Sequence, residues 1–475
     1  MPSASGGGPA AAGALTAVGP LPTRLARLSF LLQPRWTYGL VAAACILPRL
    51  VALLAERGAI LASFTEKSDD FARVFIDHGT FGLVPGFESA STQPLYAFFL
   101  IPIYRVLGRN WEAVGGAQIL VALLAALLVA RIGRKWLSPA AGLLAGLAAT
   151  LHPYLFWHDI HVNREILDTA LAAGIVALTL TLAERRRTRT AAGLGLVLGL
   201  AVLSNTRLIL LPLAVALFLV ALRGDRRRLT VLAVVALAGA ALVVLPWVVR
   251  NRVEVGCYAV TTDAKALWKA NNLNTYDTLA HDRRWIDNVP ELPNAPMTPE
   301  QAGDDWRVNG RITRVDECAQ MTLYQREVNS FWRHHPGEKA KLALQAATML
   351  WDPRAFETDT AQVTRGNLQS FVKGWVVPIY MIPLYVLSLF ALFRVRGRLI
   401  ALAAVLLAYD TVAAMVFAGA TRYRVPFDFL LALGAAAAVV ELAGLWRRRR
   451  VAAAPSAGPG GDPDGGSSAP GPAAP

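Results

Sequence analysis

The chain has 475 residues, of which 55% are hydrophobic and 17% charged, and its formal net charge is +14. This composition, with a mean hydropathy of +0.41, excludes an ordinary soluble domain, which does not carry so many uninterrupted apolar runs. The charge does not indicate nucleic-acid binding, because the basic residues cluster beside the apolar runs without an aromatic–basic platform. The sequence predicts an all-α, multi-pass membrane protein.

Both ends of the chain read as cytoplasmic tails. Residues 1–36 begin with a stretch rich in Ala, Gly, Ser and Pro, which predicts disorder. The first apolar run starts too far from Met1, and is too long, for a signal peptide. Residues 447–475 form a basic and then disordered C-terminal tail.

Apolar runs recur along the rest of the chain and predict ten membrane crossings. The stretch 94–107 is also apolar, but we expect a short helix at the outer surface there, since a further crossing would place the basic residues at 131–135 outside. The predicted spans are 38–54, 112–130, 139–153, 167–183, 192–203, 208–222, 229–249, 375–393, 399–417 and 427–445.

The basic clusters set the expected orientation, because such clusters lie in cytoplasmic loops and contact anionic lipid headgroups. They occur at 131–135, 185–189, 223–228, 394–398 and 447–450. We therefore expect a plasma-membrane protein whose core, 37–249, carries an external loop at 57–92. An external polar domain follows at 250–374, and C-terminal transmembrane helices occupy 375–446.

The predicted external domain contains no sequence motif that indicates a particular reaction. It contains no phosphate-binding loop and no GxGxxG, which argues against nucleotide chemistry. Of the three cysteines, Cys45 lies in the first span. Cys257 and Cys318 share the external domain, where they either pair in an oxidising compartment or remain two thiols.

The acidic pair Asp69-Asp70 follows the first span. Carboxylates beside lipid cost free energy, so their presence indicates a structural or functional role. The adjoining stretch reads as a short amphipathic helix that ends at Gly79, so the pair could cap that helix. Alternatively, one carboxylate does chemistry.

A second polar group lies in the predicted external loop at 152–165. His158, Asp159 and His161 could bind a divalent metal ion, and Glu165 follows His161 by one helical turn. The spacing matches no established metal motif. The alternative is a polar helix entry that meets interfacial water.

Four arginines stand at predicted outer ends of spans, against the positive-inside rule: Arg207, Arg250, Arg422 and Arg424. A guanidinium pairs with phosphate oxygens in a bidentate manner, so these side chains could converge on one phosphate. The alternative is independent contact with headgroups.

Several of these elements occur together in one order. Asp69-Asp70-Phe71 is followed by Gln93-Pro94-Leu95-Tyr96, by GLGLVLGLAVLSNTR at 193–207, by Pro246-Trp247-Val-Val-Arg250-Asn251, and by Arg422-Tyr423-Arg424-Val-Pro426. This set resembles the GT-C membrane glycosyltransferases, in particular the family 39-like group. That group includes protein O-mannosyltransferases and the enzymes that transfer aminoarabinose to lipid A.

The resemblance implies a GT-C-like transmembrane helix bundle with an external loop domain. It implies inverting transfer of a sugar from a polyprenyl-phosphate-linked donor to an acceptor on the outer face. Asp69 would be the general base, with Asp70 and Glu165 as further catalytic acids. External arginines or a metal would stabilise the leaving phosphate. The acceptor could be a protein, a glycan or a lipid.

The chain departs from the family pattern at three places. Asp-Asp replaces the common Asp-Glu, Gln93 stands where the family has a lysine, and Leu-Ser-Asn-Thr-Arg-Leu replaces the usual turn. A transporter or lipid flippase, with these charges lining a pathway, is the competing hypothesis, although no internal repeat supports it. A non-catalytic membrane scaffold is a third.

Overall fold

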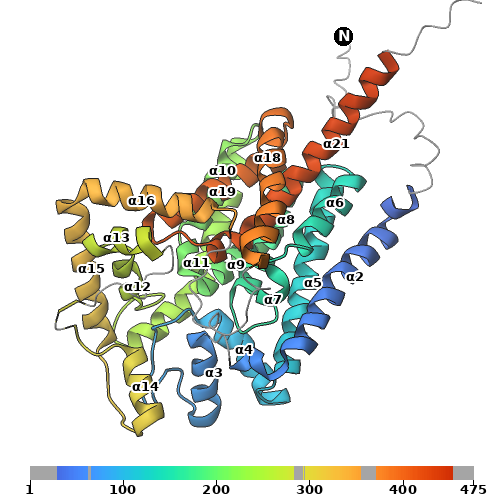
Figure 1. The fold of residues 1–475 in the computed structure, drawn as a ribbon. Coiled ribbons are helices and arrows are strands. Elements are labelled where there is room, and N and C mark those ends of the chain that lie inside the picture. Colours follow the sequence, from blue (N-terminus) through green and yellow to red (C-terminus); the bar gives the residue numbers. More distant parts are fainter. Residues whose placement is uncertain (1–28, 63–65, 283–291, 294, 355–370, 453–475) are drawn as a thin grey trace, which may run out of the picture.

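The computed structural model describes residues 29–62, 66–282, 292–293, 295–354 and 371–452 (Figure 1). Within these ranges the only β-structure is an isolated bridge between Val84 and Phe87. The helices are α2 Pro34–Glu56, α3 Lys67–His78, α4 Pro94–Leu107, α5 Trp111–Trp136, α6 Pro139–Thr150, α7 Leu155–His158, α8 Glu165–Arg185, α9 Thr188–Ser204, α10 Leu211–Ala221, α11 Arg226–Glu254, α12 Ala264–Lys269, α13 Leu273–Asp282, α14 Pro299–Asn309, α15 Glu317–His334, α16 Pro336–Trp351, α18 Val377–Arg394, α19 Arg398–Val416, α20 Thr421–Arg424 and α21 Asp428–Ala452.

Long apolar helices dominate the described part of the chain. Seven helical segments are long and apolar enough to cross a membrane. Four shorter apolar helices, which include α4, α6 and α9, accompany them. This confirms the prediction of an all-helical, multi-pass membrane protein. The predicted tails up to residue 28 and from residue 453 lie outside the described residues.

Short polar side chains begin several of these helices. Asn110 accepts a hydrogen bond from the backbone N–H of Ala113 at the start of α5, and Ser138 begins α6 in the same way. Such caps satisfy N–H groups that have no partner within the helix. Helix α3 ends as predicted at Gly79, whose φ of +71° is a conformation that glycine adopts without strain.

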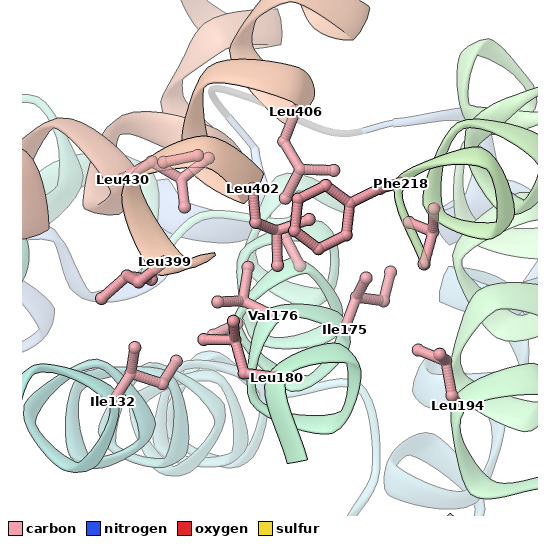
Figure 2. Close-up of a cluster of buried hydrophobic side chains, with 14 of the residues drawn as sticks. Ile132, Ile175, Val176, Leu180, Leu194, Phe218, Leu399, Leu402, Leu406 and Leu430 are labelled. Carbon is pink, nitrogen blue, oxygen red and sulfur yellow. The ribbon is translucent and has the colours of Figure 1, made fainter. Parts of the chain in front are cut away.

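The largest apolar core lies between α5, α8, α9, α10, α19 and α21. Figure 2 shows Ile175, Val176 and Leu180 of α8 at its centre, facing Phe218 of α10. Helices α9 and α11 approach closely at small residues, since a Cβ added at Gly195 would lie 2.5 Å from the carbonyl oxygen of Ala236. Close contact at small residues is how membrane helices associate without a hydrophobic driving force.

The predicted cytoplasmic basic clusters gather at one end of the bundle. Arg228, near the start of α11, donates to the carbonyl oxygen of Arg186, just past the end of α8, at 3.0 Å. Arg398, at the start of α19, donates to that of Ala183 in the last turn of α8, at 3.4 Å. We call the opposite end, where α8 and α21 begin, the site end.

Helix α4 lies across the site end. Gln93, just before α4, bonds to Arg164 and Thr206, and Arg109, just after α4, bonds to Asp69. Because both ends of α4 contact residues of the site end, this helix does not run along the bundle. Its interior Pro102 removes one backbone donor, so a long continuous helix is disfavoured here.

Helices α12–α16 are inserted between α11 and α18 and form a group beside the bundle (Figure 1). A disulfide between Cys257 and Cys318 joins the residues after α11 to α15, which resolves the alternative that the sequence left open. Lys339 of α16 donates to the carbonyl oxygen of Met415 at the end of α19, at 2.8 Å. The disulfide and this hydrogen bond both join the group to the bundle, and we call helices α12–α16 the external group after their predicted position.

Candidate active site

Two carboxylates and one guanidinium meet at the site end. Arg422 of α20 lies with its Nη2 atom 2.6 Å from Oε1 of Glu66 and 2.7 Å from Oε1 of Glu165. Its Nε also donates to Glu165, at 2.8 Å. Three segments far apart in the sequence thus supply one ion cluster: the residue before α3, the first residue of α8 and the short helix before α21.

The two carboxylates differ in their surroundings. The Glu165 side chain is 3% exposed and that of Glu66 is 13% exposed. Burial, and then the negative charge of Glu165, raise the pKa of Glu66 above its ordinary value, although Arg164 and Arg422 act in the opposite direction. Glu66 is the more accessible of the two acids, and its raised pKa suits a group that takes up a proton.

Two further arginines adjoin the cluster, and neither has a carboxylate ion-pair partner among the described residues. Arg164 donates to Gln93, while its buried Nε has no hydrogen-bond partner in the described part of the chain. Arg207 is 9% exposed, and its guanidinium lies 3.7 Å from the centre of the Tyr423 ring. The charges of Arg164 and Arg207 are close enough to repel each other.

Buried amides hold these arginines in place. Gln93 accepts from Arg164 and donates to the hydroxyl of Thr206 at 3.0 Å. Asn205 accepts from the backbone N–H of Arg207 at 3.2 Å and donates to Asp168 at 3.0 Å. Gln93, at the position where the resembled family has a lysine, therefore acts here as a bridge between two polar segments.

Asp69 does not face this cluster. Its carboxylate accepts from Arg109 Nε at 3.0 Å, from Arg109 Nη2 at 2.8 Å and from the Tyr104 hydroxyl at 2.5 Å. The side chain is 2% exposed. Helix α3 starts at Lys67, so Asp69 lies in its first turn, and the residue at the capping position is Glu66. The carboxylate of Asp69, the predicted base, is thus held by three hydrogen bonds from Tyr104 in α4 and from Arg109 just after it.

Asp70 points to the external helices. Its Oδ2 lies 2.7 Å from Nη1 of Arg307 in α14, and its Oδ1 lies 3.7 Å from Arg73. The structure therefore separates the two members of the acidic pair, since neighbours in a helix point about 100° apart. Asp69 thus pairs with Arg109 and Asp70 with Arg307, whereas Arg422 pairs with Glu66 and Glu165.

Two of the four predicted phosphate-binding arginines lie elsewhere. Arg250 pairs with Glu88 and donates to the carbonyl oxygen of Ser89 at 2.8 Å, so it holds the loop after α3 against α11. Arg424 is fully buried against Asp428 at 2.9 Å and donates to the carbonyl oxygen of Leu350 at 2.6 Å. Both guanidinium groups form ion pairs with protein carboxylates, so a phosphate-binding role for Arg250 and Arg424 stays a prediction. Arg422 and Arg207 stay at the cluster.

The predicted metal ligands do not converge. Asp159 pairs with Arg49 at 2.7 Å, His158 stacks on Tyr154, and the His161 ring stacks on Trp157 with centroids 3.7 Å apart. Among the described residues, no three His, Cys, Asp or Glu side chains are placed to hold a metal ion. Helix α7 turns these neighbours in different directions, so the metal site at His158, Asp159 and His161 stays a prediction without support from this arrangement.

The sequence reasoning missed Glu66 and Arg164. A signal was present for both, because Glu66 belongs to the same polar stretch as Asp69 and Arg164 precedes Glu165 directly. The choice among neighbouring acids depends on where α3 begins. That start is set by contacts with α14 and α4, which no local pattern in the sequence reveals.

The comparisons with known proteins agree with this fold. Residues 91–249, a third of the chain, match the family model PMT_2, described as dolichyl-phosphate-mannose-protein mannosyltransferase. No curated protein matches the chain significantly.

Solved structures resemble the whole fold. The oligosaccharyltransferase of Archaeoglobus fulgidus in its apo form matches with a TM-score of 0.50 at 13% identity, over 88% of this chain and 52% of that one. The same protein tethered to an acceptor peptide matches with a TM-score of 0.50 at 14% identity, over 89% and 51%.

ArnT from Cupriavidus metallidurans bound to undecaprenyl phosphate matches with a TM-score of 0.41 at 14% identity, over 85% of this chain and 78% of that chain. The chain spans about half the length of the archaeal enzymes. The chain thus shares the fold of the archaeal enzyme, and its central segment matches a mannosyltransferase family model, in agreement with the resemblance that the sequence motifs predicted.

Proposed function

We propose that the protein transfers a sugar from a polyprenyl-phosphate-linked donor to a hydroxyl acceptor on the outer face of the membrane, with inversion at the anomeric carbon. Glu66 is the proposed general base, in place of Asp69. Arg164 and Arg207, assisted by Arg422, bind the donor phosphate. The description of the matching family model, a dolichyl-phosphate-mannose enzyme, supports a lipid-linked donor.

One observation carries this proposal: Arg164 and Arg207 are buried or half-buried guanidinium groups without a carboxylate partner among the described residues. Glu66 and Glu165 act on Arg164 through space, and Asp410 acts on Arg207, but no carboxylate among the described residues forms a direct ion pair with either guanidinium. A bound phosphate would accept charge-assisted hydrogen bonds from both groups. The cluster of Glu66, Glu165 and Arg422 adjoins these arginines.

The proposed chemistry is a single displacement. Glu66 takes the proton of the acceptor hydroxyl as its oxygen forms a bond to the anomeric carbon. The bond from that carbon to the phosphate oxygen breaks, and the electron pair leaves with polyprenyl phosphate. The arginines stabilise the charge that develops on this leaving group. Because attack and departure occur on opposite sides of the carbon, the anomeric configuration inverts.

Glu66 suits the role of base better than Asp69 for two reasons. The Asp69 carboxylate already accepts three hydrogen bonds, two of them from a guanidinium, so both of its oxygens are engaged by protein donors. Glu66 contacts Arg422 and has the more exposed side chain. We infer that Glu165 orients Arg422 rather than accepting the proton itself.

Two features support a site on the outer face. The basic clusters lie at the opposite end of the bundle, where the positive-inside rule places the cytoplasm. The disulfide between Cys257 and Cys318 suits an oxidising compartment. A polyprenyl-linked donor reaches such a site from within the membrane, without any nucleotide-binding element.

The test uses the full chain, purified in detergent and given polyprenyl-phosphate mannose with a panel of peptide, glycan and lipid hydroxyl acceptors. We expect release of polyprenyl phosphate, and a loss of about 100-fold to 10,000-fold in kcat for Glu66→Gln. Glu338→Gln, at an exposed position of α16, is the matched control and should keep wild-type activity.

Product analysis by NMR should report the inverted anomer. A wild-type protein that consumes no polyprenyl-phosphate sugar with any acceptor would overturn the proposal. Full activity of Glu66→Gln would overturn the assignment of the base.

A further inference from the structure

Helix α14 of the external group lies along α3, the helix that begins next to Glu66. Lys67 Nζ lies 2.7 Å from Glu300 Oε1, and Arg307 Nη1 lies 2.7 Å from Asp70 Oδ2. Between these two ion pairs, Gly303 packs on the loop after α3, where an added Cβ would lie 3.0 Å from that of Leu83. Contact is thus maintained over more than two turns of α14.

The spacing of the contact residues explains why one helix can make all of these contacts. Glu300, Gly303 and Arg307 recur at intervals of three and four residues and therefore share one face of α14. Trp306 adds an edge-to-face contact with His78 at the end of α3, with centroids 5.7 Å apart. A capping box at Thr298 fixes the start of the helix.

Lys67 forms two ion pairs with helices of the external group. Besides Glu300, it contacts Asp263, the capping residue of α12, at 3.1 Å. Burial alone would lower the pKa of Lys67, but the two carboxylates outweigh that effect and raise it above its ordinary value. The ammonium group therefore stays charged and is held between two external helices.

Lys67 is also the direct neighbour of Glu66, whose own contact is with Arg422 on the bundle. The chain at this point is therefore held from both sides, by the external group through residue 67 and by the bundle through residue 66. Adjacent residues share a peptide plane, so a shift of one moves the other.

We propose that Lys67 is a positioning residue: α12 and α14 hold it so that the Glu66 carboxylate stays against Arg422 at the reaction centre. The external group is then part of the catalytic apparatus and not merely a cover. This inference rests on the proposed function of Glu66. A displacement of about 1 Å can cost on the order of 100-fold in rate when geometry is set so closely.

Two substitutions loosen this contact in different ways. Lys67→Met removes the charge and keeps the length of the side chain. Gly303→Val changes no charge but forces α14 away from Leu83, because even a single added Cβ is tightly placed. Both should lower kcat by about tenfold to 100-fold and leave KM for the donor nearly unchanged, since Arg164 and Arg207 do not touch α14.

Lys67→Arg, which keeps the charge and can reach both carboxylates, should retain most of the activity. Lys341→Met, an exposed lysine on α16, is the matched control and should behave as wild type. The acid limb of the pH profile of kcat/KM should move to higher pH in Lys67→Met and in Gly303→Val. The reason is that Glu66 loses the Arg422 charge that holds its pKa down.

A double-mutant cycle on thermal unfolding separates the two proposals. Lys67→Met, Glu300→Gln and the combined variant should show coupled effects, whether or not the protein transfers sugar. A coupled pair in an inactive wild type would mean that the proposed function fails while the contact stands. Lys67→Met and Gly303→Val with wild-type kcat and an unmoved acid limb would overturn the positioning role.

Discussion

Two groups of buried charges lie in this protein, and they are satisfied to different degrees. Arg49 and Asp159, 2% and 4% exposed, form an ion pair at 2.7 Å, and Arg49 also donates to the carbonyl oxygens of Thr150 and Cys45. Arg164 and Arg207 have no such carboxylate partner among the described residues. The first group joins helices, whereas the second is the group that we propose binds the donor phosphate.

This difference distinguishes structural charge from functional charge in a membrane protein. A buried ion pair whose hydrogen bonds are satisfied contributes to a stable fold. Removal of one partner is strongly destabilising, because it leaves the other charge buried without compensation. A cluster whose guanidinium groups lack a direct carboxylate partner can accept an anionic ligand, and buried charges of this kind are typical of functional sites. Substitutions in the first group should therefore lower mainly the stability of the protein, and substitutions in the second group mainly its binding of the donor.

The largest effect on stability is expected for Arg49→Met. The change leaves Asp159 buried and unpaired, which costs about 3–5 kcal/mol. Thermal unfolding in detergent should show a large drop in Tm. Arg49→Met combined with Asp159→Leu should recover most of that loss, since no isolated charge remains. A Tm equal to that of the wild type would mean that the pair does not stabilise the fold.

Asp69→Asn should have a smaller effect on stability. It weakens three hydrogen bonds to Arg109 and Tyr104, at a cost of about 1–3 kcal/mol, because Arg109 is partly exposed and can be hydrated. The folded fraction should retain a kcat well above that of Glu66→Gln. If Asp69→Asn abolished transfer at wild-type stability, Asp69 would be the base, as the sequence suggested.

Arg164→Met should reverse the pattern seen at Arg49. The hydrogen bond to Gln93 is lost together with the through-space attraction to Glu66 and Glu165, so the free energy of unfolding should fall by about 1–2 kcal/mol, less than for Arg49→Met. KM for the donor should rise by about tenfold or more, because a charge-assisted contact to phosphate is removed. Destabilisation as large as that of Arg49→Met would remove the distinction between the two groups.

The smallest effect is a shift in pH dependence. Glu66 must be deprotonated to accept a proton, so the rate falls as the pH drops through its pKa, which burial and Glu165 raise. Glu165→Gln removes a negative neighbour and should move the acid limb of kcat/KM to lower pH. Arg422→Gln should move it to higher pH. A limb that neither change moves would belong to another group.

Much of the architecture could be predicted from the sequence because the bilayer restricts the choices. Apolar runs must form helices in lipid, so the helices of the bundle follow from composition and length. The basic clusters at 185–189 and 223–228 meet at one end of the bundle, where hydropathy and charge together place them. The end of α3 at Gly79 followed from the same local chemistry.

The site was predicted less completely. Glu165 and Arg422 lie together although 257 residues separate them. The family pattern pointed to both, but it also pointed to Arg250 and Arg424, which are ion-paired away from the cluster. Arg250, Arg422 and Arg424 each lie at the end of a predicted span. The local sequence therefore cannot show which of these guanidinium groups joins the cluster and which pairs with a carboxylate elsewhere.

The sequence by itself determined the class of the molecule: helices long enough for a membrane, the end of the bundle that carries the basic loops, and the polar stretch that holds an acid. Only the tertiary structure decided which acid of that stretch lies beside Arg422. A turn of α3 points Asp69 at Arg109 and leaves Glu66 beside Arg422, because α4 and α14 fix where that helix begins. Side-chain direction depends on such long-range contacts, whereas the formation of membrane helices depends on local composition.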